Sequence, residues 1–235
     1  MDYLFKTNYK IKSINKDYCD NLAPWSILEI FQDVANLHVE SKNIGFNDLL
    51  KKNALWVLVG LRYEVVGKLD NDIEIITWQA KKGRAEFIRN FIIKDNSNNQ
   101  IVATSKWCLI DNITRKILPS SVVIEDISGD YIEIAPLNKL KFENLEKTVS
   151  KITVTRSMLD RNHHLNNCNY AKLIYDVIDL DKYRIKTFEI SFINEAVLND
   201  VIDIREEKID NFYYIEGYIL DKVCFKARVE VLNAL

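Results

Sequence analysis

The sequence is short of the residues and patterns that mark several protein classes. Its 235 residues include only six glycines and three prolines, too few for a collagen-like or linker-like chain. No apolar run approaches the roughly 18 residues that a membrane-spanning helix requires, so we expect no membrane span. Lys and Arg number 32 against 34 Asp and Glu, and this balance gives no electrostatic reason to expect nucleic acid binding. The 48% of hydrophobic residues instead indicates a globular chain of one large domain or two small ones.

Paired cysteines and export signals are missing too. The four cysteines, Cys19, Cys108, Cys168 and Cys224, are widely spaced and form no C-x-x-C pair. This spacing predicts neither a zinc site nor a disulfide framework, so we expect reduced thiols, no metal and no cofactor. The first twelve residues hold neither an apolar core nor a small-residue cleavage site, so no signal peptide is expected. We therefore expect a cytoplasmic protein.

The second half of the chain repeats the first at an offset of 129 residues. Residues 67–75 (GKLDNDIEI) align with residues 196–204 (AVLNDVIDI), and both patterns are typical of a turn followed by a strand. Residues 90–95 then match 217–221, and residues 101–109 match 223–231; these segments are rich in β-branched and aromatic residues. The same run of strands is therefore expected twice.

One helix is expected ahead of the strands in each half. In the first half, apolar residues recur at helical spacing after Pro24, as far as His38. In the second half they recur from Tyr170 to Ile178. An antiparallel sheet can cover the apolar face of such a helix, so we predict an α+β double hot-dog fold. Its predicted parts are a first repeat (1–125), a connection (126–150) and a second repeat (151–235). Internal repetition alone would equally allow two other α+β units packed side by side.

The second half contains a polar motif, Asp160-Arg-Asn-His-His-Leu-Asn-Asn167, between a strand expected at residues 152–156 and the helix. If the motif is extended, Asp160, Asn162 and His164 share a face and His163 points away. A carboxylate, an amide and an imidazole can together position water, hold a carbonyl group and move protons. The asparagines at positions 166 and 167 are expected to cap the helix, where free backbone amides could polarise a carbonyl oxygen.

Structural interpretations compete with these. Turns rich in Asn, Asp and His are common before helices, where they act as caps. We interpret His38 as a partly buried helix residue and His163 as a solvated one. The tryptophans at positions 56, 78 and 107 fall in apolar strands and are expected in the core.

The segment Asn162-His-His-Leu-Asn-Asn167 resembles the N-Q-H-V-N-N motif of acyl-acyl carrier protein thioesterases. Four blocks of the first half resemble segments of that family in the same order: Ala54–Leu58 (ALWVL), Thr77–Ala80 (TWQA), Ala103–Asp111 (ATSKWCLID) and Thr114–Pro119 (TRKILP). The similarity extends over nearly the whole chain. Any one block alone would be weak, but the motif with collinear blocks is fairly specific.

The resemblance implies a double hot-dog that hydrolyses fatty acyl-acyl carrier protein thioesters, giving free fatty acid and holo carrier protein. It implies that the acyl chain lies largely against the first repeat and that catalysis belongs to the second. The family's carboxylate, amide and imidazole fall on Asp160, Asn162 and His164. Its Glu-Cys pair aligns with Glu195 and Ala196, so the glutamate matches and the cysteine does not. We therefore expect attack by water, with either Asp160 or Glu195 as the base.

Other functions remain open. They are an acyl-CoA thioesterase, a hot-dog hydratase or dehydratase, and a non-catalytic acyl-binding module. The presence of all four candidate catalytic residues argues against a binding module, which has no need of them. The sequence does not determine the preferred acyl chain length, nor whether the protein is a monomer or a homodimer.

The implied partner is an acyl carrier protein with its acyl chain on phosphopantetheine. Because carrier proteins are acidic, a local basic patch could steer them even though the net charge is -2. Four basic residues surround Gly83: Lys81, Lys82, Arg84 and Arg89. They are the candidate docking patch, although such a cluster is equally typical of a solvated hairpin.

Overall fold

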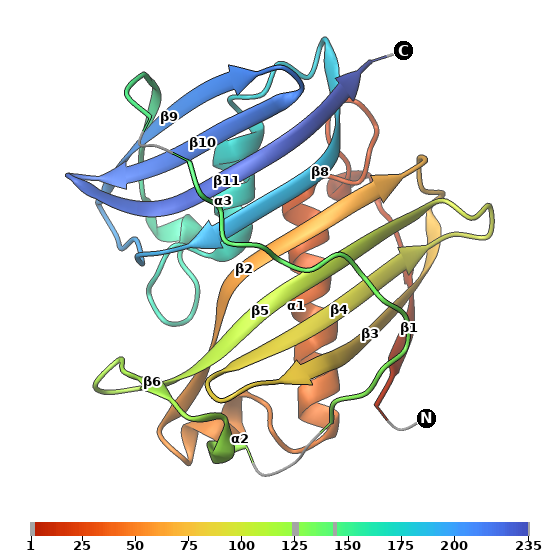
Figure 1. Cartoon of the computed structure of the whole chain (residues 1–235), viewed down its shortest axis with the longest axis vertical. Coiled ribbons are helices and arrows are strands. Elements are labelled where there is room, and N and C mark those ends of the chain that lie inside the picture. Colours follow the sequence, from red (N-terminus) through yellow and green to blue (C-terminus); the bar gives the residue numbers. More distant parts are fainter. Residues whose placement is uncertain (1–2, 124–126, 143–144, 235) are drawn as a thin grey trace.

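The computed structural model describes residues 3–123, 127–142 and 145–234, which form one 11-stranded antiparallel sheet with helices on one face (Figure 1). The first half contains β1 (Phe5–Lys10), α1 (Pro24–Ser41), α2 (Phe46–Leu50), β2 (Ala54–Val66), β3 (Asp72–Lys82), β4 (Glu86–Lys94), β5 (Gln100–Asp111) and β6 (Ile117–Leu118). The second half contains β7 (Thr148–Thr153), α3 (Asn167–Tyr175), β8 (Tyr183–Phe192), β9 (Val201–Ile209), β10 (Phe212–Ile219) and β11 (Lys222–Asn233). Single turns of 3-10 helix occur at Ser13–Asn15, Ser120–Val122 and Arg156–Met158.

The two halves are structural repeats related by their strand order. The sheet runs β1-β3-β4-β5-β2 through the first half and β8-β11-β10-β9-β7 through the second, with β6 added beside β5. The halves meet where Gly60 to Glu64 of β2 pair with Ser191 to Thr187 of β8. Asp72, which begins β3, and Val201, which begins β9, are separated by the predicted offset of 129 residues. The predicted α+β double hot-dog arrangement is confirmed.

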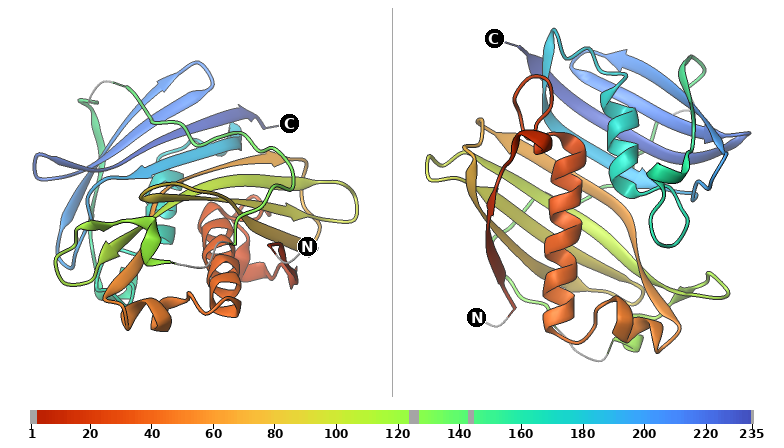
Figure 2. Two further views of the ribbon diagram at one scale, coloured as in Figure 1. Left: turned by 60° about the horizontal axis from the view of Figure 1, so that its bottom comes forward. Right: turned by 180° about the vertical axis from the view of Figure 1, so that it is seen from behind.

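One hydrophobic core lies between the sheet and the two long helices. Pro24 occupies the first turn of α1, and Ile27, Leu28 and Phe31 are buried against the sheet. The Phe31 ring packs on Phe91 of β4, with centroids 4.4 Å apart. Helices α1 and α3 contact each other side by side on the same face, as the rear view in Figure 2 shows. The core therefore runs through both repeats.

Two local predictions in the second repeat were wrong. The helix ends at Tyr175, before Val177 and Ile178, whose backbone N–H groups donate to carbonyls three residues back and tighten the chain into turns. The apolar spacing there reports burial, because Ile178 is still in the core. The strand expected at residues 152–156 ends at Thr153, and a 3-10 turn begins at Arg156.

The connection between the repeats crosses the face of the sheet opposite the helices (Figure 1). Its described part is held by a bridge between Ser128 and Gln79 and by a hydrogen bond of 3.0 Å from Thr104 Oγ1 to the Ala135 carbonyl. Tyr131 packs edge-on against Trp78, with ring centroids 5.3 Å apart. The expected boundary at residues 125 and 126 lies outside the described residues. In the described ranges, no helix combines the length and apolar character needed to cross a membrane.

Candidate active site

The polar motif of the second repeat forms a tight turn. The Asp160 N–H donates to the His164 carbonyl at 2.8 Å, and the His163 N–H donates to the Asp160 carbonyl at 3.1 Å. His163 has a φ of 64°, in the left-handed region that Asn, Asp and His adopt more often than other residues. The expectation of an extended motif was therefore wrong. Nevertheless, His163 is exposed while Asn162 and His164 are half-buried, so the two histidines have different environments.

Asp160 causes this turn. Its Oδ1 accepts the backbone N–H of Asn162 at 2.8 Å and that of His164 at 3.1 Å. Such local bonds from a carboxylate to the backbone compete with an extended chain. The Asn162 side-chain amide lies 3.4 Å from Asp160 Oδ2. The Asp160 carboxylate thus holds the other two candidate residues in place.

Glu195 reaches the motif from the segment after β8. His164 forms a bridge with Val197, and the Leu165 N–H donates to the Ala196 carbonyl at 2.8 Å. This pairing places His164 Nε2 3.4 Å from Glu195 Oε2. The four candidate catalytic residues, Asp160, Asn162, His164 and Glu195, therefore form one group in the structure. Ala196 is fully buried.

Arg115 is a residue of this site that the sequence interpretation missed. It lies in the turn between β5 and β6 of the first repeat, and its Nη2 donates to Glu195 Oε1. Asp111 shapes the turn by accepting hydrogen bonds from Thr114, which lower the pKa of its carboxyl group. A signal was available, because Arg115 belongs to the Thr114–Pro119 block that resembles the thioesterases.

Further contacts join the site to the first repeat. The Arg161 guanidinium lies over the Phe46 ring of α2, 3.5 Å from its centroid. Gln32 of α1 donates to the Cys168 sulfur at 2.9 Å. The motif therefore lies at the seam between the repeats, in contact with α1, α2 and the β5–β6 turn.

The predicted helix cap is confirmed. Asn166 is the N-cap of α3, and its side chain accepts the Cys168 N–H at 3.0 Å. The backbone N–H of Asn167, the first residue of α3, donates to no atom within the described ranges. The Cys168 thiol is buried, which raises its pKa to about 12, so it is a poor nucleophile.

The four cysteines are all unpaired. In the part of the chain that the structure describes, no three His, Cys, Asp or Glu side chains gather to hold a metal ion.

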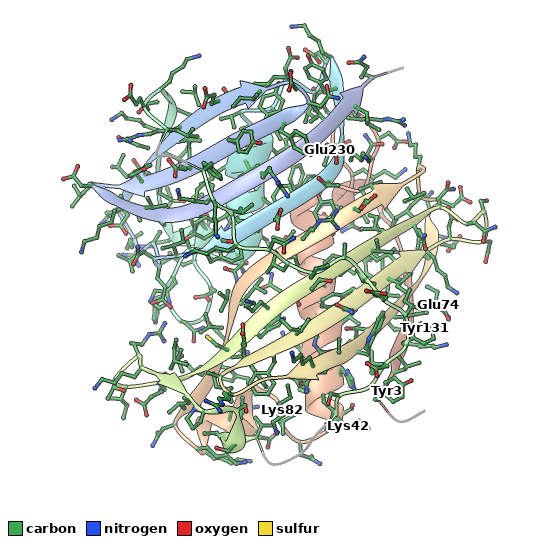
Figure 3. All side chains as sticks on the ribbon, viewed as in Figure 1. Tyr3, Lys42, Glu74, Lys82, Tyr131 and Glu230 are labelled. Atoms are coloured by element: carbon green, nitrogen blue, oxygen red, sulfur yellow. The ribbon has the colours of Figure 1, made fainter. Side chains whose placement is uncertain are left out.

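The candidate docking patch is smaller than predicted. Arg89 is 5% exposed and donates from Nη1 to Nδ1 of His38, which is itself buried under α1. Lys82, labelled in Figure 3, donates to the Val123 carbonyl at 2.6 Å. Lys81 and Arg84 are exposed. The prediction that Arg89 belongs to a surface cluster was wrong, because the alternation along β4 turns it inward between Phe87 and Phe91.

Two family models match consecutive parts of the chain. Residues 2–131 match the acyl-ACP thioesterase N-terminal domain, and residues 142–224 match the acyl-ACP thioesterase C-terminal domain. The chain belongs to the acyl-ACP thioesterase family. The family resemblance stated from the motif and its collinear blocks is confirmed.

Plant members of the family are similar along most of this chain. The chain is 25% identical over 231 residues to oleoyl-acyl carrier protein thioesterase 2 of Arabidopsis thaliana, with 83% of this chain and 62% of that protein covered. It is 26% identical over 209 residues to the oleoyl-acyl carrier protein thioesterase of Coriandrum sativum, with 76% and 55% covered. The chain thus spans less than two thirds of the length of these relatives.

Solved acyl-ACP thioesterase structures share the fold throughout. An acyl-ACP thioesterase from Bacteroides thetaiotaomicron superimposes with a TM-score of 0.90 at 21% identity, covering 98% of each chain. The 12:0-ACP thioesterase from Umbellularia californica superimposes with a TM-score of 0.87 at 18% identity, covering 99% of this chain and 98% of that one. The double hot-dog fold is therefore common to these acyl-ACP thioesterases and this chain.

Proposed function

We propose that this protein hydrolyses fatty acyl-acyl carrier protein thioesters to free fatty acid and holo carrier protein. The observation that carries the proposal is the His164–Glu195 pair, 3.4 Å apart, at the start of α3 and at the seam of the two repeats. Membership of the acyl-ACP thioesterase family supports the substrate class. The thioester brings its own phosphopantetheine, so the proposed reaction requires no cofactor.

In the proposed mechanism, Glu195 acts as the base. It accepts a proton from water while His164 orients that water toward the thioester carbon. His164 then protonates the departing thiolate, and the acid is released. The Asn162 amide and the backbone N–H of Asn167 hold the carbonyl oxygen and the oxyanion that develops on it.

We assign Asp160 a positioning role. Its Oδ1 already accepts two backbone N–H groups, whereas Glu195 faces the imidazole directly. We also propose direct attack by water, without an acyl-enzyme. Ala196 offers no nucleophile, and the nearby Cys168 thiol is buried with a raised pKa.

We propose that the acyl chain lies against the first repeat and that carrier protein is preferred to coenzyme A. Lys81 and Arg84 are the exposed cations of the candidate docking patch that support steering of an acidic partner. Four unpaired thiols suit the reducing cytoplasm in which we place the reaction.

The test is thiol release from a saturated acyl-acyl carrier protein thioester, measured beside the coenzyme A thioester of the same chain. We expect release of free thiol at a higher kcat/KM for the carrier protein substrate. A hydratase or dehydratase cannot act on a chain without a β-hydroxyl group or double bond, and a binding module would release nothing. Absence of thiol release from any saturated thioester would overturn the proposal.

A further inference from the structure

A small hollow lies under α1 in the first repeat, away from the catalytic group. Its apolar wall comes from Ala35 and Val39 of α1 and from Trp56, Phe87 and Trp107 of the sheet. Its volume is about 20 Å³, room for a single group of the size of water. Polar side chains complete the lining: Asn36, Gln79 and Arg89. Because Asn36 is exposed, the hollow opens beside α1.

A polar row crosses three strands at the hollow. Gln79 of β3 pairs with Arg89 of β4, which pairs with Ser105 of β5. Elsewhere on the same face the row is apolar, as in Ile75, Ile93 and Ile101. In the second repeat, the row at the same offset is Lys208, Tyr213 and Val229. The buried amide and guanidinium are therefore peculiar to the first repeat, where their burial carries a desolvation cost.

Arg89 is a buried cation without an acidic partner in the described ranges. It is 5% exposed, and its Nη1 donates to His38 Nδ1 at 3.0 Å and to Thr77 Oγ1 at 3.2 Å. Burial lowers its pKa to about 10, so it is charged at neutral pH. A guanidinium carries five N–H donors, and these two bonds use one nitrogen.

The amide nitrogen of Gln79 is also buried, and it has no hydrogen-bond partner in the described ranges. Buried donors in native proteins normally have acceptors. Gln79 and Arg89 therefore bring donors to the lining of the hollow without matching acceptors.

The hollow lies along α1 from the catalytic motif. Gln32 contacts Cys168 and Asn167 at the start of α3, and Asn36 follows one turn later on the same helix face. Four residues of α-helix advance about 6 Å. An acyl chain that leaves the thioester along α1 would therefore pass the mouth of the hollow.

We infer that the hollow receives an oxygen atom carried by the acyl chain, a hydroxyl or oxo group, and that the enzyme prefers such chains to unsubstituted ones. This inference rests on the proposed thioesterase function. An oxygen of this kind fits the volume and accepts from both Arg89 and Gln79, whereas a methylene group would leave both donors dry. A site built to hydrogen-bond a substrate oxygen discriminates strongly against the analogue that lacks it.

The experiment compares carrier protein thioesters of one chain length, either unsubstituted or hydroxylated at successive carbons. We expect the wild type to favour at least one hydroxylated chain in kcat/KM by about tenfold or more, as suits a hydrogen bond to a charged donor. Arg89→Met and Gln79→Met should each lower that ratio toward one. Arg184→Met, an exposed arginine at the start of β8, is the matched control and should keep the ratio.

A second readout separates this inference from the proposed function. Trp56 and Trp107 line the hollow, so their fluorescence reports binding of free hydroxylated and unsubstituted fatty acids. Tighter binding of a hydroxylated acid that Arg89→Met and Gln79→Met abolish would support the hollow even if no thioester were hydrolysed. Hydrolysis with no oxygen preference in the wild type, or with a preference that both variants retain, would overturn it while leaving the thioesterase proposal intact.

Discussion

The two repeats have one topology and different contents. Helix α1 has 18 residues and covers a sheet face with a buried polar row, whereas α3 has nine residues and begins at the catalytic turn. Shortening the helix in the second repeat leaves room for residues 156–166, which carry the motif, ahead of its N-terminus. The same scaffold therefore offers a long covered face in one copy and a helix start with free amides in the other.

Neither repeat completes the site alone. Glu195 of the second repeat is bonded on one oxygen by Arg115 of the first repeat and lies beside His164 with the other. Arg161 likewise packs on Phe46 across the seam. Catalysis is thus assigned to the second repeat, but the geometry of its groups depends on the first.

Removing the catalytic pair should give the largest loss of activity. We expect His164→Ala and Glu195→Ala each to lower kcat by about 10²-fold or more, because each removes a proton-transfer group. Asp160→Ala and Asn162→Ala should cause losses of similar size through the turn and the carbonyl contact. Steady-state thiol release measures the effect.

The matched control is His163→Ala, since this neighbouring histidine is exposed. Loss of activity in His163→Ala, with His164→Ala unaffected, would contradict the assignment of the two histidines.

Core substitutions test whether the repeats are one folding unit. Phe31→Ala in the first repeat and Phe225→Ala in the second each remove a fully buried ring from the shared core. We expect each to lower the free energy of unfolding by about 3–5 kcal/mol. Urea unfolding should give a single transition that moves to lower denaturant in both variants. Two separate transitions, only one of them shifted in each variant, would mean that the repeats unfold independently.

Arg115 tests the seam at the active site. We expect Arg115→Met to lower kcat by about tenfold with little change in KM, because Glu195 loses the contact that positions its carboxylate. Arg115→Lys should recover part of the rate, since it restores a cation. Lys116→Met, at the exposed neighbouring residue, serves as the control. An unchanged kcat in Arg115→Met would remove the first repeat from the catalytic geometry.

Reversing charge on the docking patch should give the smallest effect. We expect Lys81→Glu with Arg84→Glu to lower kcat/KM for carrier protein substrates a few-fold at low salt. The difference should shrink near 1 M salt, where the Debye length is about 3 Å. A short synthetic thioester should be affected far less.

The control for this prediction is the pair Lys182→Glu and Arg184→Glu, two exposed cations near the start of β8. Equal loss in both double variants would argue against a local patch.

Much of the architecture is visible in local sequence signals. The repeat at an offset of 129 residues, the helix start at Pro24 and the Asn166 cap all depend on residues close together in the chain. Arg89 was also accessible, because it alternates with Phe87 and Phe91 along one strand face. The basic neighbours of Gly83 hid that pattern and favoured a solvated interpretation.

The sequence by itself determined the order of elements, the duplication and the identity of the candidate catalytic residues, since periodicity and capping are local properties. Only the tertiary structure decided how these residues meet. The Asp160 carboxylate turns the motif by binding backbone N–H groups, and strand pairing carries Glu195 to His164. Arg115 reaches Glu195 across 80 positions of sequence. Such contacts arise because the sheet brings the two repeats edge to edge, and no local pattern encodes which side chains then face each other.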